Sequence, residues 1–130
     1  MKPFQLILLL GAFLGFSSVA IGAFAAHGLK GQLTEQAMAW LQTGVQYQMA
    51  HSLVILVLGF ALKMWPNWSP LKYSAYGFGL GILLFSGSLY FMAITHNKAL
   101  VLLTPIGGLS LLVAWGILVV AAWRGHLQKD

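Results

Sequence analysis

The sequence predicts an all-α membrane protein, an antiparallel bundle of four transmembrane helices that forms a single domain over residues 1–130. The chain is 59% hydrophobic and only 7% charged, whereas soluble domains are about 25% charged. Crossing the hydrocarbon core of a bilayer takes about 20 apolar residues in a helix. Four runs meet this requirement, and we expect spans at residues 4–26, 35–64, 72–95 and 104–123.

The first span, residues 4–26, exceeds the 7–15 or so apolar residues of a signal peptide, so we interpret it as a membrane helix. It ends in "GAFAAHGLKG", residues 22–31. Gly28 follows the expected last turn, where a left-handed residue commonly terminates a helix. His27 would suit the negative end of the helix dipole when it is charged.

The second helix is expected to begin outside the lipid. Thr34 is a suitable N-cap, and residues 35–46 contain several glutamines, which predicts an amphipathic extension at the outer surface. "WPNWSP" at residues 65–70 ends this helix, because residues before proline avoid the helical region. The third span follows at residues 72–95.

The fourth span contains Thr104-Pro105, which allows two interpretations. Thr104 caps a helix that runs over residues 105–123, with proline in the first turn, or the helix begins near Ala99 and kinks at Pro105. We slightly favour the first, in which "KALVLL" is a short apolar segment at the outer side.

The distribution of cations predicts that both termini are cytoplasmic. Cytoplasmic loops carry an excess of Lys and Arg. This orientation places five of the seven cations inside: Lys2, Lys63, Lys72, Arg124 and Lys129. Lys30 and Lys98 then lie outside. The scattered cations form no basic face, so we expect no nucleic-acid partner. The bilayer is the expected partner, and we expect a multi-pass membrane protein.

Small residues recur at spacings that let membrane helices approach closely. We interpret most of them as helix-packing positions: Gly11, Gly15, Gly22, Gly77, Gly81, Gly107 and Gly108. The same faces leave open a homo-oligomer or a membrane-protein partner.

Polar side chains of the four spans lie at one depth when the helices are laid antiparallel. At 1.5 Å per residue they lie about 20 Å above the inner boundary. The candidate layer consists of His27 at its outer edge, Tyr47, His51, Ser86, Ser88 and Tyr90. An ionisable group in a span is a functional candidate by default. The more common role of such a histidine is a neutral hydrogen bond between helices.

Several classes of site are not supported. No histidines have metal-ligand spacing, and no carboxylates are placed to orient them, so we expect no metal, haem or other cofactor. Glu35 and Asp130 are the two carboxylates and form no pair in the sequence. No nucleophile or phosphate-binding motif is present, so we expect no enzyme.

Four segments together resemble the YgdD-like family of small bacterial inner-membrane proteins of unknown function, which has eukaryotic TMEM-type relatives. They are "GAFAAHGLK" (22–30), "TGVQYQMAHSL" (43–53), "LFSGSLY" (84–90) and "TPIGGLSLLVAW" (104–115). Ala25 departs from the family's usual glycine. The resemblance implies a four-span membrane protein and supplies no activity. Its motif positions include His27, Tyr47, His51 and Tyr90.

Two functions follow as hypotheses. The first is a small scaffold, accessory or assembly subunit, based on the small-residue faces and the absence of catalytic motifs. The second is a binding or permeation module for a lipid, quinone or small solute, based on the polar layer around His51. A layer that is dry and fully paired would count against the second.

Overall fold

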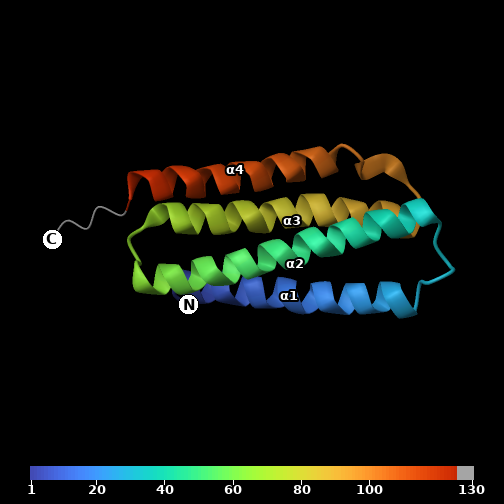
Figure 1. The fold of residues 1–130 in the computed structure, drawn as a ribbon, viewed down its shortest axis with the longest axis horizontal. Coiled ribbons are helices and arrows are strands. Elements are labelled where there is room, and N and C mark those ends of the chain that lie inside the picture. Colours follow the sequence, from blue (N-terminus) through green and yellow to red (C-terminus); the bar gives the residue numbers. More distant parts are fainter. Residues whose placement is uncertain (126–130) are drawn as a thin grey trace.

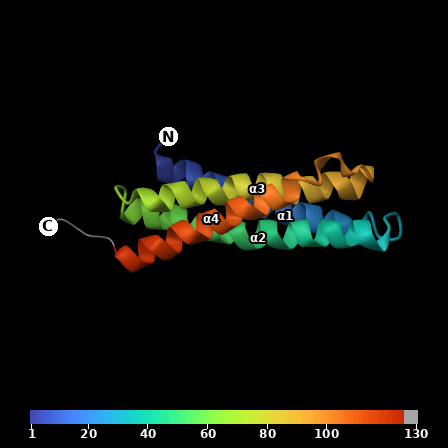
Figure 2. The same cartoon turned by 90° about the horizontal axis from the view of Figure 1, so that it is seen from above.

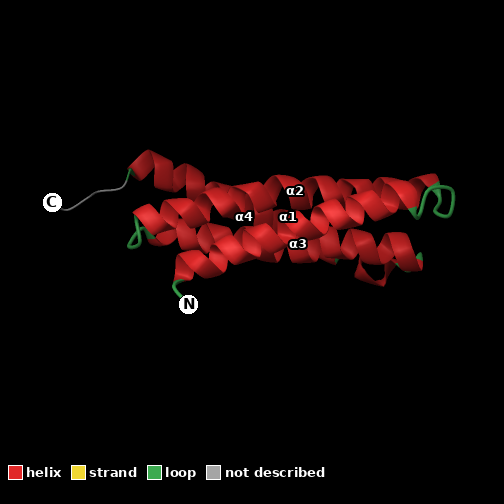
Figure 3. Cartoon of the chain, turned by 90° about the horizontal axis from the view of Figure 1, so that it is seen from below, coloured by secondary structure: helices red, strands yellow, loops and turns green. Residues whose placement is uncertain are grey.

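The computed structural model describes residues 1–125 as an antiparallel arrangement of four long helices (Figure 1). These helices are α1 (Pro3–His27), α2 (Glu35–Met64), α3 (Ser69–Thr95) and α4 (Leu103–Arg124), with a short 3₁₀ turn, η1 (Lys98–Leu100), before α4. Each long helix is apolar and long enough to cross a membrane. No strand occurs within residues 1–125, as Figure 3 also shows. The predicted all-α membrane fold is therefore confirmed.

The molecule has two distinct ends. We call the end with residues 28–34 and 96–102 the distal end, and the end with the N-terminus and residues 65–68 the proximal end (Figure 1). Lys2, Lys63, Lys72 and Arg124 lie near the proximal helix ends, and Lys30 and Lys98 lie at the distal end. Lys129 and Asp130 are outside the described residues. Which end faces the cytoplasm stays a prediction.

The four helices do not form a closed ring. Contacts are extensive between α1 and α2, between α2 and α3, and between α3 and α4, whereas α1 touches α3 only lightly. Figure 2 shows α4 crossing the bundle at an angle to the other helices. Because α4 packs along α3 and makes few contacts with α2, one side of the bundle stays open between α2 and α4.

Glycines set these close helix contacts. A Cβ added to Gly11 would lie 2.9 Å from Leu56 Cγ of α2. A Cβ on Gly107 would lie 2.8 Å from the Leu84 carbonyl carbon and would also clash with the Phe85 amide nitrogen. The other packing glycines face Ser52 (Gly15), Val45 (Gly22), Ala114 (Gly77) and Leu111 (Gly81). Gly108 differs, because its nearest neighbour would be the Phe85 ring at 3.8 Å.

Helix α2 begins as predicted, because Thr34 Oγ1 accepts a hydrogen bond from the Ala37 amide at 3.1 Å. The prediction of a left-handed Gly28 is wrong. Gly28 has φ −90° and ψ −31°, which are right-handed values, and the left-handed residue is Gly31 with φ 78°. The glycine at position 28 instead provides space, because a Cβ there would lie 2.7 Å from the Phe24 ring.

Thr104 does not cap the fourth helix. Helix α4 begins at Leu103 and has no side-chain cap. The Thr104 hydroxyl instead lies 2.6 Å from the Ser88 hydroxyl of α3. The alternative of one helix from Ala99 is wrong as well, since residues 98–100 form the separate turn η1. Because the Thr104 hydroxyl bonds to Ser88 on the neighbouring helix, it is not available to cap α4.

Candidate functional site

Part of the polar layer is a hydrogen-bonded junction between three helices. We call Ser17, Gln48 and Tyr90 the Gln48 junction. The Gln48 amide nitrogen donates to the Leu14 carbonyl at 2.9 Å and to Ser17 Oγ at 2.7 Å. The Tyr90 hydroxyl donates to Gln48 Oε1 at 2.7 Å. Gln48 is 3% exposed, so this amide satisfies its buried polar atoms by joining α1, α2 and α3.

Gln48 is not among the candidate residues that the sequence predicts, because the glutamines of this region are typical of the polar side of a surface extension. The signal was present, because an amide three residues before His51 lies within the apolar part of the second helix. Lipid offers no hydrogen-bond partner there, so a buried amide needs a partner on another helix.

The two predicted serines also take part in helix packing. Ser86 Oγ donates to the Gly44 carbonyl of α2 at 2.7 Å. Ser88 Oγ donates to the Phe85 carbonyl at 2.9 Å and contacts Thr104 of α4. Within residues 1–125, no buried side-chain nitrogen or oxygen lacks a hydrogen-bond partner. The buried polar side chains in this part of the layer are therefore paired within the protein.

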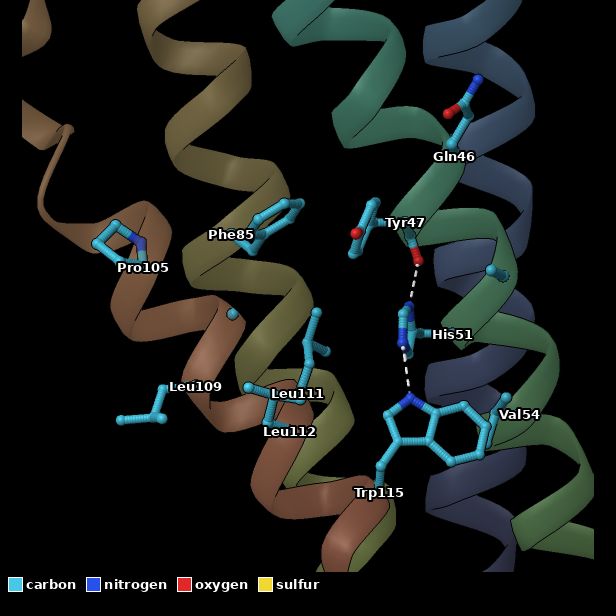
Figure 4. Close-up of a pocket in the computed structure, with 12 residues that line it drawn as sticks. Gln46, Tyr47, His51, Val54, Phe85, Pro105, Leu109, Leu111, Leu112 and Trp115 are labelled. Atoms are coloured by element: carbon cyan, nitrogen blue, oxygen red, sulfur yellow. Dashed lines mark hydrogen bonds between the residues drawn. The ribbon is translucent and has the colours of Figure 1, made fainter.

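The other part of the layer lines an open groove with a volume of about 890 Å³. We call it the α2–α4 groove. Its floor is Phe85 of α3, and its two walls come from α2 and α4 (Figure 4). The α2 wall consists of Gln46, Tyr47, Ala50, His51 and Val54. The α4 wall consists of Pro105, Gly108, Leu109, Leu111, Leu112 and Trp115.

His51 connects the two walls at the proximal end of the groove. Its Nδ1 lies 2.7 Å from the Tyr47 carbonyl oxygen, and its Nε2 lies 3.1 Å from Trp115 Nε1 (Figure 4). A carbonyl only accepts and an indole N–H only donates. The hydrogen is therefore on Nδ1, Nε2 accepts from Trp115, and the imidazole is neutral. Both ring nitrogens are engaged.

Aromatic contacts hold His51 in this position. The His51 ring lies 5.4 Å from the buried Phe78 ring and 5.8 Å from the Tyr47 ring, centroid to centroid. Phe78 also meets the Trp115 indole edge-on at 5.1 Å, and Tyr47 lies 4.5 Å from Phe85. These ring contacts surround His51 and leave its imidazole ring little freedom to turn.

The predicted site residues thus divide into three groups. Tyr47 and His51 line the groove, and Ser86, Ser88 and Tyr90 join helices. His27, the third case, is exposed at the end of α1 and neither lines the groove nor joins helices. Sequence reasoning missed Trp115 and Phe85, and it assigned Gly108 to packing although Gly108 faces the groove. The described residues contain no group of three or more potential metal ligands.

Comparison with known proteins identifies relatives over most of the chain. Residues 21–108 match the family described as "Protein of unknown function (DUF423)". The chain is 40% identical over 124 residues to the UPF0382 inner membrane protein YgdD of Escherichia coli strain K12, covering 92% of this chain and 91% of YgdD. It is 36% identical over 118 residues to the UPF0382 membrane protein YwdK of Bacillus subtilis strain 168, covering 91% of this chain and 96% of YwdK.

A UPF0382 membrane protein of Haemophilus influenzae is also 40% identical, over 117 residues that cover 90% of this chain and 93% of that protein. No solved structure matches the chain. The relatives named inner membrane proteins and the four membrane-length helices place the chain in the bacterial inner membrane as a multi-pass protein. The chain belongs to the DUF423 family, whose UPF0382 members are membrane proteins of unknown function.

Proposed function

We propose that this protein binds an apolar molecule of the bilayer in the α2–α4 groove and catalyses no reaction on it. The observation that carries the proposal is the groove itself. Its volume of about 890 Å³ lies in the range of small-molecule sites, about 300–1,000 Å³. Most of its lining is apolar, with a few polar groups, which is the usual composition of such sites.

The position of the groove supports access from the lipid. Its α4 wall runs from Pro105 to Trp115, which is about 15 Å of helix and about half of a 30 Å hydrocarbon core. Leu109 and Leu112 of that wall are 61% and 69% exposed. A molecule within one leaflet therefore reaches the groove laterally, without crossing a polar surface.

The chemistry of the groove supports binding and not catalysis. Within residues 1–125, no Asp or Glu lines the groove, and His51 has both nitrogens engaged. General acid–base catalysis needs a group free to exchange a proton with the substrate. Glu35 lies at the distal start of α2, outside the groove lining. We therefore propose that the protein is not an enzyme.

The predicted scaffold role depended on small-residue faces. Six of the seven predicted packing glycines contact another helix of the same chain, so those faces are already occupied. A scaffold, an oligomer or a membrane-protein partner therefore stays a prediction for which these contacts give no support.

Filling the groove tests the proposal. Gly108 lines it, and its Cβ position is 3.8 Å from the nearest atom, so Gly108→Leu places a side chain in the groove while α4 keeps its contact with α3. Native mass spectrometry of protein extracted from membranes should show a bound small molecule in the wild type. We expect its occupancy to fall at least tenfold in Gly108→Leu.

Gly116→Leu is the matched control, because it makes the same change on α4 at a position with no atom within 4 Å and outside the groove lining. It should retain the bound molecule. Equal occupancy in all three proteins, or no bound molecule in the wild type, would contradict the proposal.

A further inference from the structure

We infer that the groove selects an uncharged amphiphile of the bilayer, whose hydroxyl or carbonyl head lies at Tyr47 and whose apolar chain runs toward Trp115. This inference rests on the proposed function and names its ligand class. The proposed occupant is a lipid-like molecule and not a partner helix, because a helix would contribute an apolar face without a hydrogen-bonding head.

Charge excludes ionic heads. Among the residues that the structure describes, no Lys, Arg, Asp or Glu side chain lines the groove, and His51 is neutral in the geometry described above. A phosphate, carboxylate or ammonium group in this groove would lose its water and gain no counterion, which is costly for a buried charge. An uncharged head avoids this cost.

Unused hydrogen-bonding groups locate the head. The polar nitrogens of His51 and Trp115 bond to each other, and the other His51 nitrogen bonds to the Tyr47 carbonyl. Within residues 1–125, the Tyr47 hydroxyl and the Gln46 carboxamide make no hydrogen bond, although both residues line the groove. Figure 4 shows Tyr47 facing the groove toward one end and Trp115 at the other, whereas the Gln46 side chain extends away from α4. The Tyr47 hydroxyl is therefore the group that is placed to meet a polar head.

The remainder of the groove suits a hydrocarbon chain. Below Tyr47, the walls present Val54, Leu109 and Leu112, and Trp115 closes the proximal end. The distal end, where Gln46 lies, is the end nearer the α1–α2 loop and the surface of the bundle. The head therefore faces the nearer polar boundary of the leaflet and the chain faces the bilayer midplane, which is the orientation of an ordinary amphiphile.

Bromine quenching of Trp115 tests the inference. The protein is placed in nanodiscs with Trp40, Trp65, Trp68 and Trp123 changed to Phe, so that Trp115 alone emits. Four probes share a mid-chain dibrominated octadecyl chain: the alcohol, the carboxylate, the trimethylammonium and the alkane without a head. We expect saturable quenching by the alcohol, with at least tenfold weaker apparent affinity for both charged probes and an intermediate value for the alkane.

Two changes locate the head and the chain. Tyr47→Phe should weaken the alcohol about fivefold, the effect of losing one hydrogen bond of about 1 kcal/mol, and should leave the alkane unchanged. Gly108→Leu should abolish saturable quenching by every probe. A variant that retains Trp123 alone, at 89% exposure on α4, is the control for non-specific contact and should show only linear quenching.

If the single-tryptophan protein does not fold, the quenching of Trp115 is obtained instead as the difference in quenching between the wild type and Trp115→Phe. Equal affinity for charged and uncharged heads, or a Tyr47→Phe variant with unchanged alcohol affinity, would overturn the inference and leave apolar binding in place. If Gly108→Leu leaves the quenching of Trp115 by all four probes unchanged, the inference and the proposed function both fail.

Discussion

The Gln48 junction and the α2–α4 groove lie at similar depths of the same bundle, yet they use polar side chains in opposite ways. In the junction, α1, α2 and α3 close around Gln48, which is 3% exposed and bonds to both neighbouring helices. At the groove, α4 makes few contacts with α2, and Tyr47 is 43% exposed. The difference shows that depth in the membrane does not decide the role of a polar residue. Closure of the surrounding helices decides it.

The largest effect is expected where α4 contacts α3. Gly107→Leu would place its side chain against the α3 backbone at Leu84 and Phe85, which has no room to move. We expect a loss of about 3 kcal/mol or more, the upper end for overpacking, measured by unfolding in mixed detergent micelles. The neighbouring change Gly108→Ala, with 3.8 Å of clearance, should cost less than 0.5 kcal/mol or so. Similar losses in both would show that α4 is not held at Gly107.

The next effect concerns the centre of the junction. Gln48→Leu removes three hydrogen bonds and leaves the half-buried Tyr90 hydroxyl without this acceptor. Interhelical bonds in membranes contribute about 0.6 kcal/mol each on average, so we expect a loss of about 2 kcal/mol in the same unfolding measurement. Gln46→Leu, on the exposed groove side, is the control and should be nearly neutral. Equal costs at positions 46 and 48 would remove the distinction between the two regions.

A pair of tyrosines gives a finer comparison. Tyr90→Phe leaves Gln48 Oε1 without its donor and should cost about 1 kcal/mol of stability. Tyr47→Phe removes a hydroxyl that makes no hydrogen bond within residues 1–125 and should change stability by less than about 0.5 kcal/mol. Thermal unfolding of the two variants side by side measures this. A larger loss of stability for Tyr47→Phe than for Tyr90→Phe would mean that the Tyr47 hydroxyl makes a hydrogen bond within the protein even when no ligand is bound.

The smallest expected effect is at the bridge between α2 and α4. Trp115→Phe removes the hydrogen bond to His51 Nε2 but keeps an aromatic ring against Phe78. We expect a loss of about 0.6 kcal/mol, an average interhelical bond in a membrane. Trp123→Phe changes a residue that is 89% exposed and should be neutral in the same unfolding assay. If the two variants are equally stable, the bridge contributes no measurable stability.

Much of the fold follows from local patterns. Apolar runs of membrane length predict the four helices, and the Thr34 cap depends only on the neighbouring residues. The capping roles of Gly28 and Thr104 were predicted by the same local logic and were wrong. Phe24 requires the glycine at position 28 for space, and Ser88 engages the Thr104 hydroxyl. Phe24 lies one turn before Gly28, so that contact is local, although the choice between a left-handed cap and space for the ring is not evident from spacing alone. The contact of Thr104 with Ser88 depends on how α4 packs against α3.

The candidate site was only partly predictable for a related reason. Counting residues along each helix gives the depth of Tyr47, His51 and Tyr90, but it does not give the rotation of each helix about its axis. The four helices are apolar on nearly every side and have almost no amphipathic preference. The hydrophobic pattern that orients helices in soluble proteins is therefore missing, and Gln48 and Trp115 could not be assigned to a neighbour.

The sequence by itself determined the membrane class, the four helices and the level at which polar groups gather, because these depend on composition and on the rise per residue. The tertiary structure decided which of those groups bond to each other and which line a groove. Gly107 allows α4 to lie against the α3 backbone, and α4 makes few contacts with α2. Tyr47 and His51 therefore border the groove, while Gln48 and Tyr90 do not. That outcome depends on close packing between helices, which lipid does not impose and only the complementary shapes of the helices specify.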